Sequence, residues 1–156
     1  AAAPAPAAES ERGIAAWTET LRLDPKNVSA RVNRGMAYAE KGDYDRAVAD
    51  LTEALRHDPR NAQAYASRGV VHATMRADYA RGILDLTQAI RCAPDELILY
   101  EFRALFYKAV GDAVHAAADD RKAAELRPRG TLSNLRLGPA GAVALATAPE
   151  SRLPRP

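Results

Sequence analysis

Residues 28–61 read VSARVNRGMAYAEKGDYDRAVADLTEALRHDPRN and predict one helix–turn–helix unit. Between the two helices, Gly42 can adopt the positive φ that a helix end often needs. The second helix has Ala47 and Leu51 in its apolar stripe and stops before Pro59, which cannot continue a helix. One such pair cannot bury its apolar faces alone, so the stretch predicts further copies.

The markers of this unit recur in register along the chain. Pro59 lies 34 residues after Pro25 and 35 residues before Pro94, and Pro128 follows after another 34. The extra residue of the middle copy falls in the stretch 76–79, where a loop is predicted. A loop is the expected place, because an insertion inside a helix would rotate its apolar stripe by about 100°.

A helix pair that repeats every 34 residues, with W-x-x-L-G-x-x-Y, then A-x-x-x-F, then P, is the pattern of the tetratricopeptide repeat. The chain resembles this family over about residues 9–128. The matching positions are Gly35, Tyr38, Ala47, Ala54, Pro59, Gly69, Gly82, Ala89, Pro94, Tyr107, Ala116, Ala123 and Pro128. In the third full repeat, Ala104 stands where the first two have Gly35 and Gly69. The resemblance implies an all-α fold, an α-solenoid of tetratricopeptide-type helix pairs with about three and a half repeats in a right-handed superhelix.

The chain is predicted to divide at the helix-ending prolines and at changes of composition. The parts are an Ala/Pro-rich linker (1–9), a half repeat of one second helix (10–27), three full repeats (28–61, 62–96 and 97–130), and a short cap turn with a disordered tail (131–156). Helices are expected at 10–23, 28–41, 44–56, 62–75, 79–91, 97–110 and 113–125. Asn27 and Asn61 suit the caps of two first helices, because their side-chain oxygens can accept backbone N–H bonds.

The charge balance argues against a nucleic-acid surface. The chain has 22 Lys and Arg against 20 Asp and Glu, a net charge of +2. From Arg129 onward there are four arginines and one glutamate, a net of +3, so the preceding residues carry −1. A phosphate-binding surface needs clustered Lys and Arg, which the repeats lack.

Compartment is left open by the sequence. No apolar run reaches the ~18 residues of a membrane helix, so membrane insertion is not expected. The single cysteine, Cys92, cannot form an internal disulfide and says little about redox environment. The small residues at the start suit a processed exported protein, so periplasmic or secreted and cytoplasmic locations both stay open.

The polar residues do not predict an enzyme, and no catalytic residue, cofactor or metal site is expected. No nucleophile is paired with a base and an orienting acid. His57 and Cys92 share a column of adjacent repeats, roughly 10 Å apart by helix-packing distances, too far to bind one metal directly. His72 replaces the tyrosine of the Tyr38 and Tyr107 column and is expected to be a packed core imidazole.

The family resemblance assigns the function to a surface. In tetratricopeptide proteins the first helices line a concave face that binds extended peptides or partner helices. Register then predicts a mostly uncharged groove and a non-enzymatic scaffold for protein–protein interaction, with a protein or peptide as ligand. The predicted groove residues are Val32, Asn33, Met36, Glu40, Gln63, Ser67, Val70, Phe102, Leu105 and Lys108.

A second candidate surface lies at the N-terminal end. Ile14, Trp17 and Leu21 form the stripe of a second helix whose first helix does not precede it, because Pro4 and Pro6 interrupt that segment. An exposed apolar stripe marks an interface, so its cover is expected to be another copy, another subunit or the segment around 132–137. The alternatives to groove binding are therefore self-assembly through this end, and a regulatory repeat region of a larger enzyme.

The register makes opposite predictions for one column of the second helices. Leu51→Asp and Leu86→Asp should unfold the array, because each forfeits roughly 1.5–3 kcal/mol of apolar burial and places a carboxylate in an interface. Asp120→Leu, at the same column of the last repeat, should be neutral or stabilising. Urea unfolding of the three variants checks this, and a strongly destabilised Asp120→Leu protein would contradict it.

Overall fold

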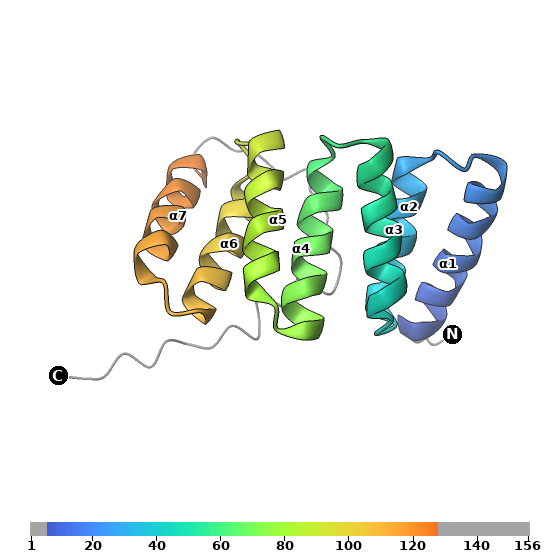
Figure 1. Cartoon of the computed structure of the whole chain (residues 1–156), viewed down its shortest axis with the longest axis horizontal. Coiled ribbons are helices and arrows are strands. Elements are labelled where there is room, and N and C mark those ends of the chain that lie inside the picture. Colours follow the sequence, from blue (N-terminus) through green and yellow to red (C-terminus); the bar gives the residue numbers. More distant parts are fainter. Residues whose placement is uncertain (1–5, 128–156) are drawn as a thin grey trace.

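A computed structural model describes residues 6–127, which form seven α-helices and no strand. The helices follow one another with short turns and run alternately up and down in one row (Figure 1). Their bounds are α1 Pro6–Leu23, α2 Val28–Glu40, α3 Tyr44–His57, α4 Ala62–Arg76, α5 Tyr79–Cys92, α6 Leu97–Ala109 and α7 Ala113–Leu126. The fold is thus the predicted all-α array, with three helix pairs preceded by a single helix.

Side-chain caps explain why the helices begin where they do. Asn27 and Asn61 accept hydrogen bonds from the backbone N–H groups of Ala30 and Ala64, both at 2.9 Å, which confirms the two predicted caps. Asp43, Asp78 and Asp112 cap α3, α5 and α7 in the same way, whereas Glu96 before α6 makes no side-chain cap bond. Each cap satisfies a backbone donor that a helix start leaves unpaired.

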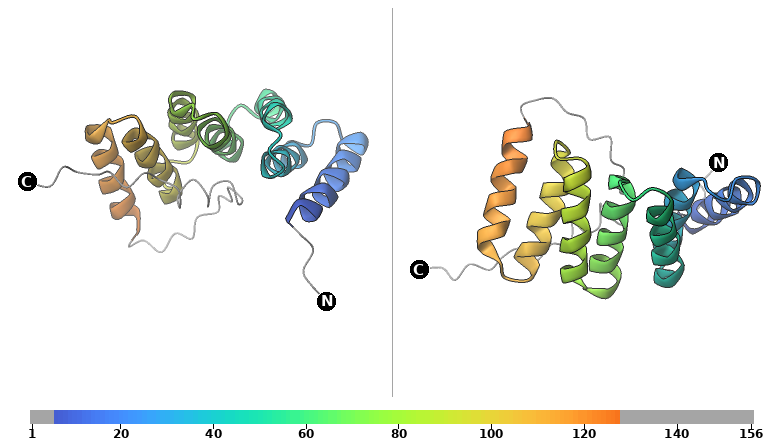
Figure 2. Two further views of the ribbon diagram at one scale, coloured as in Figure 1. Left: turned by 90° about the horizontal axis from the view of Figure 1, so that it is seen from below. Right: turned by 45° about the horizontal axis from the view of Figure 1, so that its top comes forward.

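The array is a two-layered curve. The layer of α2, α4 and α6 lies on the inner side, and α3 and α5 lie on the outer side (Figure 2). Within the inner layer α2 contacts α4 and α4 contacts α6, whereas among residues 6–127 the outer helices make no comparable contact with one another. The inner helices are therefore closer together, which gives the array its concave face.

Two continuous clusters of side chains form the core between repeats. Leu51 joins residues of α2, α3 and α4, and Leu86 joins residues of α4, α5 and α6; both leucines are fully buried. Small residues let the helices of a pair approach closely. A Cβ on Gly69 would lie 3.0 Å from the backbone oxygen of Gly82, so a larger residue there would push the pair apart.

A recurring chain of three polar side chains links neighbouring repeats. In the middle repeat, Arg68 forms two hydrogen bonds of 2.9 and 2.8 Å to the carboxylate of Asp85, and a third of 3.1 Å to the hydroxyl of Thr52 in the preceding repeat. The hydrogen bond to Asp85 raises the pKa of Arg68, although burial opposes it. The same chain occurs as Thr18–Arg34–Asp50 and Thr87–Arg103–Asp119.

In the middle repeat, the stretch 76–79 that was predicted to hold the extra residue spans the end of α4 and the start of α5. Helix α4 continues through Arg76, so the helix is longer than α2 and the turn that follows is shorter. Ala77 then takes a left-handed conformation, with φ of 53°, and the backbone N–H of Asp78 bonds back to His72. The insertion leaves the apolar stripe unrotated because it comes after the last buried residue of α4, Ala73.

Several expectations concern the ends of the chain. Helix α1 begins at Pro6, four residues earlier than predicted, and proline is compatible with the first turn of a helix. The linker up to residue 5, the cap turn at 131–137 and the disordered tail lie outside the described residues. Within 6–127, no helix combines the length and the apolar character that a bilayer crossing requires.

The last repeat ends in an ion pair rather than an apolar seam. Asp120 is exposed, whereas Leu51 and Leu86 of the same column are buried, and it binds Lys108 at 2.8 Å. Lys108 occupies the column in which Ala39 and Ala73 are buried. The neighbouring Asp119 points the other way and is only 5% exposed, in its bond to Arg103. Helical geometry thus gives two adjacent acids separate roles.

The ion pair between Arg68 and Asp85 is expected to contribute to the free energy of unfolding. Asp85→Leu should lower the free energy of unfolding by about 2–4 kcal/mol, because it leaves a half-buried guanidinium without its carboxylate. Adding Arg68→Met should restore much of that loss, since the uncompensated charge is then removed as well. Urea unfolding of the two single variants and the double variant measures the coupling.

Thr52→Val serves as the matched control, since it removes only the exposed end of the same chain and should cost less than about 1 kcal/mol. Strictly additive losses in the double variant would show that the pair does not act as one unit.

Candidate functional site

The concave face is the first candidate for a binding surface. It is formed by the sides of α2, α4 and α6 that the outer helices leave uncovered. On this face Asn33 and Glu40 are exposed, while Met36, Gln63 and Leu105 are half-buried. The amide nitrogen of Gln63 donates to the sulfur of Met36 at 3.8 Å, which ties α4 to α2. Five of the predicted groove residues are therefore accessible to a partner.

Four other predicted groove residues are buried inside the array and present almost no side-chain surface. They are Val32 (4% exposed), Ser67 (3%), Val70 (1%) and Phe102 (1%). Phe102 packs on α4 beside Val70, and Val32 packs in the cluster between α2, α3 and α4. Replacing Val32 or Phe102 by Asp or Arg is therefore expected to destabilise the array as well as change its surface.

Lys108, the tenth predicted groove residue, is exposed but is engaged at the C-terminal end. Its ammonium group lies 2.8 Å from the carboxylate of Asp120 on α7. The positive charge of Lys108 is therefore partly neutralised by Asp120. The other accessible groove residues have amide or apolar side chains, apart from the carboxylate of Glu40.

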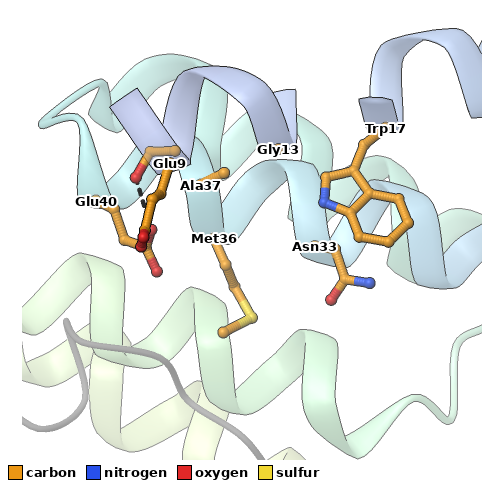
Figure 3. A pocket seen from close by; sticks show the side chains of 8 residues that line it. Glu9, Gly13, Trp17, Asn33, Met36, Ala37 and Glu40 are labelled. Carbon is orange, nitrogen blue, oxygen red and sulfur yellow. Dashed lines mark hydrogen bonds between the residues drawn. The ribbon is translucent and has the colours of Figure 1, made fainter. Parts of the chain in front are cut away.

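A distinct pocket lies at the N-terminal end of the concave face, between α1 and α2. It has a volume of about 350 Å³. Trp17 and Asn33 lie at one end of it, Glu9 and Glu40 at the other, and Met36 between them (Figure 3). The lining is completed by Ser10, Gly13 and Ala37. The pocket unites residues that the sequence had assigned to two separate surfaces.

The other members of the predicted N-terminal interface differ in exposure. Leu21 is 8% exposed and belongs to the core, whereas Ile14 and Trp17 are half-buried. Helix α1 packs extensively only on α2. Of the predicted stripe, Trp17 is thus the residue that a partner can reach through the pocket.

The polar wall of the pocket is held by hydrogen bonds and ion pairs around it. The hydroxyl of Ser10 donates to Glu40 at 2.8 Å, which joins α1 to α2. Next to it, Lys41 binds Glu11 at 2.8 Å. The Lys41 hydrogen bond lowers the pKa of Glu11. The second turn of α1 is therefore fixed on the C-terminal end of α2.

His72 is the buried histidine of the array. Its Nδ1 atom lies 2.8 Å from the hydroxyl of Tyr44, and its Nε2 atom lies 3.9 Å from the carboxylate of Asp85. Burial lowers the pKa of His72; Asp85 counters this, while Arg68 and Arg81 add to it. The imidazole is a core group, as its column predicted.

In the described part of the chain, no three His, Cys, Asp or Glu side chains are grouped to hold a metal ion. His57 lies beside Glu53, 3.3 Å away, and Cys92 is a free, half-buried thiol. The residues of the concave face include no nucleophile beside a base. Their chemistry is that of a surface for hydrogen bonds and apolar contacts.

Comparison with known proteins agrees with the repeat geometry. A family model of the tetratricopeptide repeat matches residues 7–72. Over these residues the chain has the tetratricopeptide repeat. The match covers α1, the pair α2–α3 and most of α4, so it includes the half repeat and both walls of the pocket. No curated protein matches the sequence.

The tetratricopeptide array is also similar to solved structures of MamA. One crystal structure of MamA has a TM-score of 0.70 at 22% identity, covering 83% of this chain and 70% of that one. A second has a TM-score of 0.67 at 21% identity, covering 86% and 84%. MamA from Desulfovibrio magneticus RS-1 has a TM-score of 0.70 at 20% identity, covering 79% and 69%. Identities this low show a shared fold.

Two functional features were missed by the sequence reasoning. The Thr–Arg–Asp chains recur at steps of 34 and 35 residues, so the columns of Arg34 and Asp50 carried a signal that could have been used. Glu9 and Gly13 of the pocket were missed as well. Gly13 shares the column of the small residues Ala47 and Gly82, which marks the face on which a first helix packs.

His72 should make the stability of the tetratricopeptide array depend on pH. Because burial lowers its pKa below the ordinary 6.5, the unfolded chain binds a proton more readily than the folded one. The contribution of neutral His72 is therefore complete above about pH 6.5 and declines as the pH falls below that value. Urea unfolding at several pH values between about 8 and 5.5 measures the slope.

The non-titrating variant His72→Gln should have a shallower slope over this range, whatever its stability at neutral pH. His57 and His115 are unchanged in that variant, so the two proteins differ only at residue 72. Parallel slopes for the two proteins would contradict the assignment.

Proposed function

We propose that this chain is a non-enzymatic scaffold that binds a segment of a partner protein on its concave face. The observation that carries the proposal is the arrangement of α2, α4 and α6. They form an inner layer whose accessible residues, including Asn33, Met36, Gln63 and Leu105, lie over a tightly packed core. Repeat arrays commonly use such curved, preformed surfaces for binding.

The chemistry of this face suits a peptide or helix. Half-buried Met36 and Leu105 offer apolar contact, and Asn33 and Gln63 offer amide donors and acceptors for a partner backbone. Little of the face must be reorganised on binding, because its helices are fixed by the core and by the Thr–Arg–Asp chains. Preorganisation of this kind lowers the entropy lost on association.

Self-assembly is a second candidate, and a specific observation favours it. Trp17 is only half-covered and borders an open pocket between α1 and α2. A second copy could cover it. A repeat region that regulates a larger enzyme, the third alternative, would use the same concave face, with its catalytic part outside these residues.

Selection of peptides from a displayed 12-residue library against the intact chain tests the proposal. Bound peptides should lose at least about tenfold in affinity with Leu105→Lys, because burying a leucine-sized apolar contact contributes roughly 1.5–3 kcal/mol. Leu84→Lys is the matched control, since Leu84 lies on α5 in the outer layer and is 66% exposed. Fluorescence anisotropy gives the affinities, and thermal melts verify that both variants fold.

Selected peptides that bind both variants equally well would place the binding surface elsewhere and contradict the proposal.

A further inference from the structure

Within residues 6–127, no helix covers the face of α1 that is equivalent to the covered face of every complete repeat. In the first full repeat, α2 packs on α3 so closely that a Cβ on Gly35 would lie 3.0 Å from Leu51 and 3.2 Å from the backbone oxygen of Ala47. The equivalent face of α1 carries Gly13 and Trp17. No helix of the described residues lies on it, because α1 packs extensively only on α2.

The residues of this face leave room instead of filling it. A Cβ on Gly13 would meet only the indole nitrogen of Trp17, at 3.8 Å, whereas the same construction on Gly35 or Gly69 meets neighbours at 3.0 Å. Close packing therefore requires Gly35 and Gly69 but not Gly13. The space beside Gly13 is the pocket of about 350 Å³ between Trp17 and Met36.

The exposure of residues in the inner layer also indicates an uncovered position beside α2. Asn33, Ser67 and Phe102 occupy one column of the first helices, yet only Asn33 is exposed. Phe102 is buried because it packs on the preceding first helix, α4. For α2 no preceding first helix is described. A helix in the pocket would cover Asn33 as α4 covers Phe102.

The occupant does not have to supply the buried arginine of a complete repeat. In each complete repeat, the arginine of the first helix binds an aspartate of the second helix. These aspartates are Asp50 on α3, Asp85 on α5 and Asp119 on α7. The same column of α1 holds Ala16, which is exposed. An uncharged helix face can therefore lie there without leaving an unpaired carboxylate beneath it.

One end of the pocket does call for positive charge. The carboxylates of Glu9 and Glu40 lie together at that end (Figure 3), and no Lys or Arg lines the pocket. Ser10 donates to Glu40, and the nearby Lys41 is paired with Glu11. Among the described residues neither Glu9 nor Glu40 has an ion pair. Two adjacent carboxylates attract a cation at this end and disfavour an acidic partner.

We propose that the α1–α2 pocket binds an amphipathic α-helix of a partner protein that carries one large apolar side chain and a Lys or Arg about two turns later. The inference rests on the proposed scaffold function and specifies its partner. Trp17 and Glu9 are eight residues apart on α1, which is about 12 Å of helix. A partner antiparallel to α1, as first helices are to second helices here, presents the apolar anchor first and the cation seven or eight residues later.

Gly13, midway between Trp17 and Glu9, sets a third requirement. The helices of a pair meet through small residues at this level, as Gly69 and Gly82 do. The partner should therefore carry Gly or Ala four residues after its anchor. Larger residues there would hold the helix away from α1 and out of the pocket.

A synthetic helix tests the proposal on the intact 156-residue chain. The probe is a stapled, fluorescein-labelled alanine-based peptide with one leucine, alanine four residues later, and lysines seven and eight residues later. Two control peptides replace the lysines by glutamates or the leucine by glutamine. Trp17 is the single tryptophan of the chain, so its emission reports on the pocket alone. The lysine probe should shift that emission to shorter wavelength and bind at least about tenfold more tightly than either control.

Two variants of the chain separate the pocket from the rest of the surface. Gly13→Leu should reduce the affinity of the probe more than about tenfold, because the new side chain fills the pocket; leucine also favours helix, so the fold should be retained. Glu9→Lys should weaken binding about two- to fivefold, the effect of an exposed charge pair. Glu125→Lys on α7, the charge control, should leave affinity unchanged.

The alternatives give different results. Equal binding of the probe to the parent chain and to Gly13→Leu would overturn the pocket assignment, while library peptides still sensitive to Leu105→Lys would leave the scaffold function standing. A concentration-dependent dimer in sedimentation that Gly13→Leu abolishes would assign the pocket to a second copy. Tighter probe binding after removal of residues 128–156 would assign it to the chain's own C-terminal segment. Either of the last two results overturns the proposal.

Discussion

The arginine in each first helix is the residue on which the order of the array depends. Through one guanidinium, Arg68 bonds to a carboxylate within its own repeat and to a hydroxyl of the preceding repeat. The planar, forked geometry of arginine makes these bonds possible at once, in a way that lysine could not reproduce. Because the same connection occurs three times, it fixes the rotation of each pair relative to the next. The apolar clusters bury the larger surface, and the arginines fix the orientation of one repeat relative to the next.

This constraint determines what the concave face can be. Since the first helices are held on both sides, the residues between them are committed to packing, and only their innermost positions stay accessible. At the N-terminal end the pattern is incomplete: α2 has its arginine bonded to Thr18 of α1, but its inner flank has no neighbour among the described residues. The pocket beside Trp17 is a direct result of that incompleteness. Its geometry follows from the repeat, and its negative charge comes from Glu9 and Glu40.

Much of the fold could be predicted from the sequence because the signals are local. Asn27 and Asn61 mark helix starts by chemistry that acts within three residues, and the helix-ending prolines set the period. The conformation of the turn after α4 could not be predicted, since Ala77 carries no sign that it would be left-handed after a lengthened helix. The surface was harder still. Asn33 and Phe102 share a column, yet one is exposed and the other buried, because burial depends on the neighbouring helix rather than on the column itself.

The ion pair between Lys108 and Asp120 gives the array two chemically unlike ends. Where inner repeats present alanine and leucine to the next pair, this end presents an ammonium group and a carboxylate, both about half exposed. A copy stacked head to tail would have to dehydrate that pair against the Trp17 end of its neighbour, and the dehydration of charged groups opposes such a contact. Unlimited end-to-end growth, the hazard of any open heterologous contact, is therefore disfavoured by two side chains. Within residues 6–127, the last repeat therefore presents a polar surface, whereas α1 presents the half-buried Trp17.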